Sequence, residues 1–192
     1  MEYPAGPPVL FSNLLWRKKK EPSLLARDSK NYPHVMHRRI IAVTDLDGPI
    51  EELAGKTPHK ILAIWAADCA ERVLPCFEEN YPEDPRPRTA IEACREWVRT
   101  GVFRMHAVRS TSLAAHAAAR GIPEFDPARS AARAAGQAIA TAHVPAHAVA
   151  AARYAATAVR DAADPPDSER LTMKEREWQY GHLLRLREQL NP

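Results

Sequence analysis

The sequence predicts an all-α protein, an Ala-rich bundle of about six helices preceded by a largely irregular N-terminal arm. The 192 residues include 34 alanines and only 7 glycines, and alanine has the highest intrinsic helix propensity. After residue 57, apolar residues recur at helical spacing, and Pro or Gly separates one helical segment from the next. With 45% apolar and 27% charged residues, the composition and length are those of one globular domain.

The start of the chain has the composition of an arm. Seven of the 17 prolines fall in the first 58 residues, where no helical period is sustained. Residues 1–40 carry eight Lys or Arg against three Asp or Glu, so most of the basic character of the chain lies there. We expect residues 44–50 to form a polar turn. The predicted organisation is a basic, Pro-containing arm over residues 1–57 and a helical bundle domain over residues 58–192.

Three helices open the predicted bundle. Thr57 is the expected N-cap of the first, with Pro58 at its first helical position. Pro75 kinks or ends this helix, because proline lacks the N–H that continues the hydrogen-bond ladder. After a proline-rich loop, a second helix is expected over residues 88–100 and a third over residues 105–120, each followed by a glycine.

The rest of the chain predicts longer helices. We expect Asp126 to cap a segment that continues to Ala163 and is rich in small residues, which favour close helix packing. Because Pro145 lies inside this segment, a kink or break is expected at about residues 142–145. Ser168 is the predicted cap of a final amphipathic helix.

Polar side chains on the first predicted helix are candidates for a site. Asp68 lies on the same helix face as Trp65, so its carboxylate should be partly buried and needs a partner. Cys69 is adjacent, and Glu71 follows one turn later. Arg88 or a histidine of the long helix could pair with Asp68. The cluster is either a structural ion-pair group or part of a functional site.

Histidines form a second group of candidates. His143 and His147 are four residues apart, which places two imidazoles on one helix face, and His116 on a neighbouring helix could join them. We expect these histidines to be partners of Asp68 inside the bundle. No cofactor is predicted; a divalent metal at His143 and His147 is an alternative, which Pro145 disfavours because it disturbs the turn between them.

Five segments carry a resemblance to a known family: residues 65–75 (WAADCAERVLP), 81–88 (YPEDPRPR), 90–93 (AIEA) with Trp97, 131–136 (AARAAG) and 140–147 (ATAHVPAH). Together they resemble the immunity-five-like family of immunity proteins, assigned to bacterial polymorphic toxin systems. The resemblance covers about residues 58–190. It implies a small, all-helical, cytoplasmic protein that neutralises a cognate toxin by binding it. Gln137 stands where the family usually has another histidine.

The leading hypothesis is therefore a protein that binds a cognate toxin or another protein. The alternative is a small helical enzyme or ligand-binding protein, a biosynthetic role included, with an Asp, His and Cys pocket inside the bundle. Both an enzyme and a non-enzymatic protein fit the sequence. Nucleic-acid binding is expected only through the basic arm, because the rest of the chain is nearly neutral.

No segment has the roughly 18 to 20 apolar residues of a membrane span. Three cysteines without a pairing pattern favour a location in the cytoplasm. The predicted site residues are Asp68, Cys69, Glu71, Arg88, His116, His143 and His147.

Overall fold

A computed structural model describes residues 40–189, and these residues are entirely helical apart from turns and loops. The helices are α1 (Asp47–Gly55), α2 (His59–Val73), α3 (Pro75–Glu78), α4 (Arg86–Thr100), α5 (Met105–Arg120), α6 (Pro127–Ala140), α7 (His147–Ala162) and α8 (Pro165–Glu188). The six long helices from α2 onward and the one-turn helix α3 confirm the predicted all-α bundle. No helix in this part of the chain is long and apolar enough to span a bilayer.

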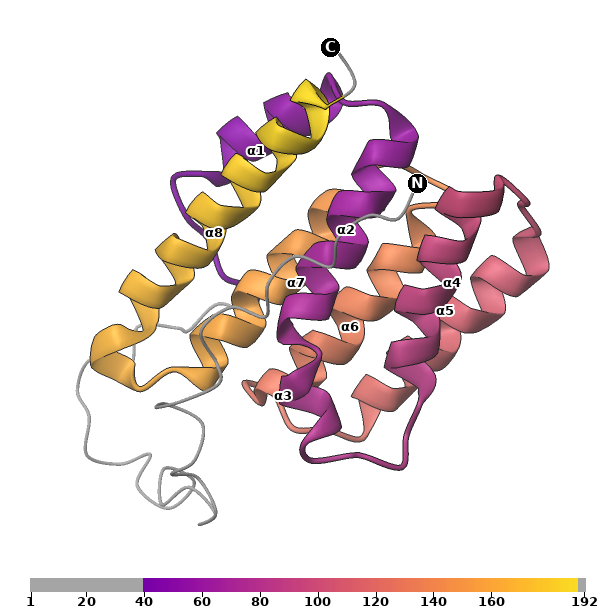
Figure 1. Ribbon diagram of the computed structural model, residues 1–192. Coiled ribbons are helices and arrows are strands. Elements are labelled where there is room, and N and C mark those ends of the chain that lie inside the picture. The colour runs from indigo at the N-terminus through magenta and orange to yellow at the C-terminus, as the bar shows by residue number, and fades with distance from the viewer. Residues whose placement is uncertain (1–39, 190–192) are drawn as a thin grey trace.

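Helices α2, α6 and α7 form the centre of the bundle. Figure 1 shows α8 and α1 on one side of α2, and α4, α5 and α6 on the other. Contacts agree with this view, because α2 packs against α4, α6, α7 and α8, while α6 and α7 make the most extensive contact of any helix pair. The two ends of the described chain meet where α1 packs on α8.

Alanine dominates the interface between the central helices. The fully buried apolar side chains of α6 and the buried ones of α7 are almost all methyl groups. Such small side chains let two helix backbones approach closely. Larger side chains fill the space elsewhere in the core, chiefly Trp65 of α2 and Phe77 of α3, both fully buried.

Several predicted boundaries are confirmed. The Asp126 side chain accepts a hydrogen bond from the Ala128 N–H at 2.9 Å, so it caps α6, and Pro127 occupies the first helical position. The long segment breaks into α6 and α7 at residues 141–146, where Pro145 was expected to interrupt it. Gly101 ends α4 with φ of 69°, in the left-handed region that glycine adopts at low cost.

Two cap predictions and one predicted helix start are wrong by a few residues. The Thr57 hydroxyl donates to the Leu53 carbonyl at 2.7 Å, at the end of α1, and does not cap α2. Helix α4 begins at Arg86, two residues earlier than expected, because Pro87 fits in the first turn of a helix. Ser168 lies inside α8, which begins at Pro165 for the same reason.

The polar turn predicted for residues 44–50 is also wrong. Helix α1 begins at Asp47, and its Ile50 side chain is completely buried in the main core. The apolar spacing of Ile50, Leu53 and Ala54 is that of one helix face, but the segment is short and follows a basic, Pro-containing stretch. The segment assigned to the arm thus includes a helix that packs on α8. The remaining arm, residues 1–39, lies outside the described residues.

Candidate functional site

The structure separates the predicted site residues into three places. Asp68, Glu71 and Arg88 belong to an ion-pair cluster between α2, α3 and α4. Cys69 is buried in the core. His116, His143 and His147 line a cavity formed by α5, α6 and the start of α7. The single pocket of Asp, Cys and His expected for the enzyme alternative is therefore divided.

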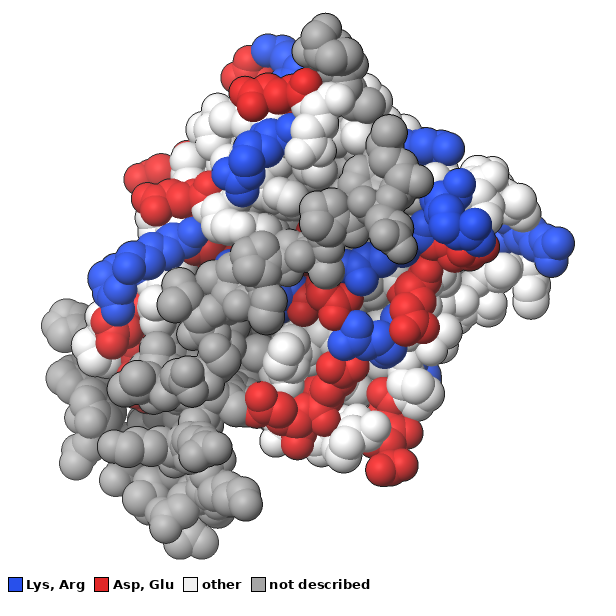
Figure 2. Space-filling model, viewed as in Figure 1, with Lys and Arg blue, Asp and Glu red and all other residues white. Residues whose placement is uncertain are grey.

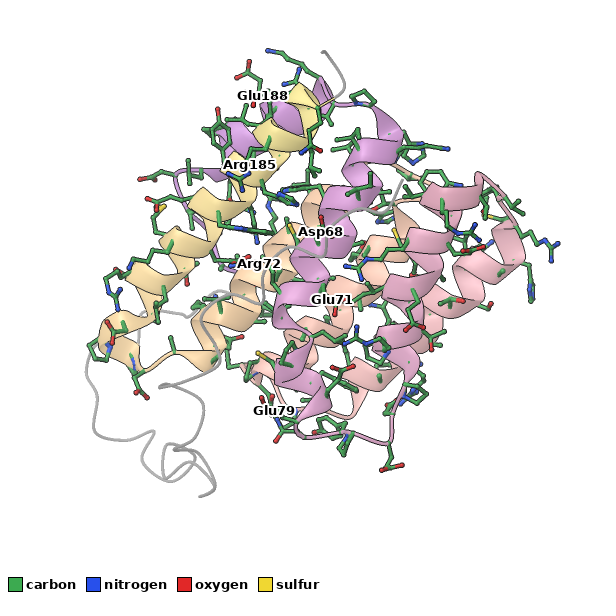
Figure 3. The ribbon with its side chains drawn as sticks, in the orientation of Figure 1. Asp68, Glu71, Arg72, Glu79, Arg185 and Glu188 are labelled. Carbon is green, nitrogen blue, oxygen red and sulfur yellow. The ribbon has the colours of Figure 1, made fainter. Side chains whose placement is uncertain are left out.

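The α2–α4 ion-pair cluster consists of Asp68, Glu71, Glu78, Arg88 and Arg95. Glu71 accepts hydrogen bonds from Arg88 at 2.6 Å and from Arg95 at 3.1 Å, and Arg88 also makes a bidentate pair with Glu78, both distances being 2.9 Å. The hydrogen bond to Glu78 is the main cause that raises the pKa of Arg88. Figure 3 shows Asp68 and Glu71 on the same helix, α2.

Asp68 does not have the partners expected from the sequence. Its Oδ2 accepts from the Nε2 of His182 on α8 at 2.8 Å, and its Oδ1 accepts from Arg95 at 3.4 Å. Its side chain is 30% exposed, so the carboxylate retains water and does not need a buried histidine. In Figure 2 acidic and basic side chains alternate over this face. Partly exposed pairs of this kind contribute little to stability, about 0 to 1 kcal/mol each.

A second polar group, which the sequence analysis missed, lies under α8. This α8 polar network joins Asp47, Arg72, Glu175, Arg176 and Gln179. Glu175 accepts from Arg72 at 2.8 Å and from the Gln179 amide at 3.0 Å, while the buried Arg176 donates to Gln179 at 2.7 Å and to Asp47. The network connects α8 to α1 and α2. The sequence signal that could have revealed this network is the four-residue spacing of Glu175 and Gln179, which places both on one face of an amphipathic helix.

Aromatic stacking connects this network to the exposed cluster. The guanidinium of Arg72 lies 3.7 Å from the centre of the Trp178 ring, a favourable cation–π geometry. Trp178 in turn stacks on His182, with ring centres 4.8 Å apart. Trp178 thus holds the ring of His182, the partner of Asp68, in place on α8. This arrangement indicates a structural role for Asp68 and His182.

The histidine cavity is the hollow of about 400 Å³ between α5, α6 and the start of α7. Its polar lining residues are Arg109, Ser112, His116, Gln137, His143 and His147, and its apolar lining residues are Met105, Val108, Leu113 and Ala140. Helical spacing explains the set on α5, because Met105, Arg109 and Leu113 are four residues apart and share one face. The helix is interrupted between α6 and α7, and this turn brings His143 and His147 to the same opening.

Two hydrogen bonds fix the polar wall of the cavity. The Nδ1 of His147 lies 2.7 Å from the Oε1 of Gln137, and since an amide oxygen only accepts, Nδ1 carries the proton. The Ser112 hydroxyl donates to the Gly136 carbonyl at 2.9 Å. The Nδ1 of His116 is buried and has no hydrogen-bond partner within residues 40–189.

Two of the cavity histidines, His116 and His147, have lowered pKa values. Burial is the main cause that lowers the pKa of His116, and the charges of Arg133, His147 and Arg120 lower it further. Burial also lowers the pKa of His147, with a smaller effect from His143. Both imidazoles are therefore mainly neutral at pH 7. Within the described part of the chain, no three side chains of His, Cys, Asp or Glu are grouped as a metal ion requires.

Gly136 allows α6 to approach the His116 ring. A Cβ atom at this position would lie 3.0 Å from the His116 Cε1 and 3.1 Å from the Ser112 carbonyl oxygen. We expect Gly136→Ala to lower the free energy of unfolding by about 1 to 2 kcal/mol, because overpacking outweighs the helix propensity gained. Urea denaturation followed by circular dichroism measures this change.

Gly181 of α8 is the matched control. Its added Cβ would meet only the flexible end of Arg185, at 3.4 Å. Gly181→Ala should therefore raise the free energy of unfolding by about 0.5 to 1 kcal/mol. Equal effects of the two substitutions would show that Gly136 is not needed for the contact with His116.

The three cysteines are buried without disulfides. Burial raises the pKa of Cys76 and of Cys94 to about 12, and it raises that of Cys69 well above the ordinary value. Since the thiolate is the reactive form, we expect none of the three to react with Ellman's reagent at pH 8 in the native protein. All three should react in concentrated urea. Rapid reaction of one thiol in the native state would contradict the burial of that residue.

Comparison with known proteins gives one match. Residues 52–186 match the family described as "Imm-5 like putative immunity protein". Neither the search of curated proteins nor that of solved structures found a similar protein. The matched segment spans the end of α1, all of α2 to α7 and most of α8, and so contains both the ion-pair cluster and the histidine cavity. Since it also covers well over half of the 192 residues, the chain belongs to the Imm-5-like family of immunity proteins.

Proposed function

We propose that this protein neutralises a cognate bacterial toxin by binding it directly, through the surface of α5. Family membership supports the general role, since immunity proteins act on a protein partner. The separation of Asp68 and Cys69 from the cavity histidines favours this role over the enzyme alternative, because the pocket no longer combines an acid or a thiol with an imidazole.

The observation that carries the proposal is a set of exposed apolar side chains in the loop before α5 and along the first half of that helix. We call Val102, Phe103, Met105 and Leu113 the α5 surface; all four are exposed, although they are large and apolar. Met105 and Leu113 also border a shallow hollow along the helix together with Arg109. Clustered apolar side chains on a protein surface mark sites of protein–protein contact.

Growth rescue tests the proposal. Proteins captured from the source bacterium with the tagged full-length chain would be identified, and each would be expressed in a bacterial host with and without this protein. We expect one captured protein to stop growth and this protein to restore it. If no captured protein is toxic, or if the toxic one is not neutralised, the proposal fails.

Substitution of Leu113 tests the surface itself. Leu113→Asp places an unpaired carboxylate in an apolar contact, so we expect affinity for the toxin to fall by about 100-fold or more, with rescue lost and the helical content unchanged. Val43→Asp is the control, because Val43 and Leu113 are both 58% exposed. Calorimetric titration with the identified toxin measures both. Equal loss in the two variants would place the interface elsewhere.

A further inference from the structure

We propose that the histidine cavity binds a carboxylate side chain of the toxin, an Asp or Glu with apolar neighbours. The inference rests on the proposed function and adds what the partner presents to the cavity beside the α5 surface. Three features of the cavity support the inference: the charges that surround it, the hydrogen-bonding groups that line it and the apolar side chains at its opening.

The charges around the cavity all have one sign. Its titratable lining residues are an arginine, Arg109, and three histidines, and its lining includes no carboxylate. Helix α5 has no Asp or Glu along its whole length. Arg120 of α5 and Arg133 of α6 lie close enough to His116 to affect its titration. The carboxylates of the ion-pair cluster are not among the lining residues, and they already pair with Arg88, Arg95 and His182. An anionic group would therefore complement the cavity, whereas a cation would be repelled.

The lining also offers hydrogen-bonding capacity that is not used within the protein. Gln137 uses its Oε1 for His147, which leaves its NH₂ group as a donor at the cavity wall. His116 also lines the cavity, and its buried Nδ1 has no hydrogen-bond partner in the described chain. Arg109 is exposed at the opening and has five N–H donors that suit a carboxylate.

Apolar side chains at the opening favour a protein segment over a free ion. Met105 and Leu113 border the cavity and are both exposed, and Val108 lies below them. A small anion would use the donors but leave these side chains in water. An acidic residue flanked by apolar residues would use the donors and cover the apolar surface as well.

Protonation of the cavity histidines should strengthen this contact. In the free protein His116 and His147 are mainly neutral at pH 7, because their pKa values are lowered. A bound carboxylate stabilises the imidazolium form and raises these pKa values, so affinity increases as pH falls from 8 to 6 while the carboxylate itself stays ionised. The groups that face His116 are Arg120 on its own helix, Arg133 on α6 and His147 on α7, none of which reverses this direction.

A side-chain mimic tests the cavity in the absence of the toxin. The full-length protein, with its histidines labelled for NMR, is titrated with N-acetylglutamic acid α-amide, which carries one carboxylate. We expect a saturable shift of the His116 and His147 signals and a rise in their pKa values. The uncharged N-acetylglutamine amide should give neither effect. Failure of the carboxylate probe to shift these signals, or equal shifts with the amide, would overturn the inference.

Inorganic phosphate and two arginine variants complete the test. If phosphate binds and the carboxylate probe does not, the cavity is a phosphate site and the inference is wrong. Arg109→Gln should weaken binding of the probe by about threefold or more, because it removes a charge at the opening. Arg99→Gln is the matched control, since Arg99 is exposed on α4 and pairs with Glu96 away from the cavity lining. Equal effects of the two substitutions would contradict the assignment.

The identified toxin separates this inference from the proposed function. We expect His147→Gln to lower the affinity for the toxin by about tenfold at pH 6 and less at pH 8, and to flatten the pH dependence. If the toxin is neutralised but binding is unaffected by pH and by this substitution, only the inference fails. If the probe binds but no toxin is found, the proposed function fails while the cavity remains a carboxylate site.

Discussion

Replacing Trp65 with alanine is expected to lower the free energy of unfolding by about 3 to 5 kcal/mol. The Trp65 side chain is 0% exposed and is the largest fully buried side chain of the described chain. Its Nε1 donates to the backbone carbonyl of Gln179 at 2.8 Å, so the substitution removes both an apolar contact and a hydrogen bond between α2 and α8. The surrounding alanines cannot fill the cavity, because their side chains have no free rotamers. Urea denaturation followed by circular dichroism measures the loss.

Trp97 of α4 is the control for Trp65. It is only partly buried and contacts the His59 ring at a tilt of 49°, with ring centres 5.0 Å apart. Trp97→Ala should therefore lower the free energy of unfolding by less than half as much as Trp65→Ala. A third variant, Trp65→Phe, keeps most of the apolar volume and should remove about 1 kcal/mol for the hydrogen bond. Equal losses at Trp65 and Trp97 would contradict the central position of α2.

Replacing Arg176 with methionine should lower the free energy of unfolding by about 3 to 5 kcal/mol, although the two side chains have similar lengths. Arg176 is 1% exposed and donates to both Asp47 and Gln179. Without its guanidinium, the carboxylate of Asp47, at the first residue of α1, loses the cation with which it pairs. Breaking a buried ion pair on one side leaves an uncompensated charge, and this cost exceeds the net stabilisation by the pair.

The double variant Asp47→Asn with Arg176→Met distinguishes this explanation from a simple loss of packing. Because the second substitution removes the uncompensated charge, the double variant should be more stable than Arg176→Met alone, with a coupling free energy of about 1 to 3 kcal/mol. Denaturation of the two single variants and the double variant measures it. Strictly additive losses would mean that Asp47 and Arg176 do not interact as described.

Local sequence signals determined most of the fold. Pro145 broke the long helical segment at the expected place, and Asp126 with Pro127 began α6 as expected, since both effects depend only on neighbouring residues. Helix α1 was missed because its nine residues are too few for a helical period to be clear. Its stability comes from the burial of Ile50 against other helices, which no local pattern contains.

Site residues were harder to place, because their partners come from distant helices. The sequence singled out Asp68 on α2 as a polar group on a largely apolar helix, whereas His143, expected on the long helix, lies in the turns between α6 and α7. It could not show that His182, 114 positions away, is the partner of Asp68, because pairing depends on which helices become neighbours. The same holds for Arg109, which the sequence analysis did not single out and which lines one cavity with His143 and His147 in the folded chain.

The bond between Trp65 and Gln179 also bears on how the chain is made. The two residues are 114 positions apart, and α8 is the last helix of the bundle. During synthesis α4 to α7 can pack against their sequence neighbours as they leave the ribosome. The apolar face of α2 that α8 covers stays uncovered until α8 has been synthesised. Until then Trp65 is accessible to chaperones and to other nascent chains. We expect chains truncated before α8 to be degraded or to aggregate, so that only chains that include α8 accumulate.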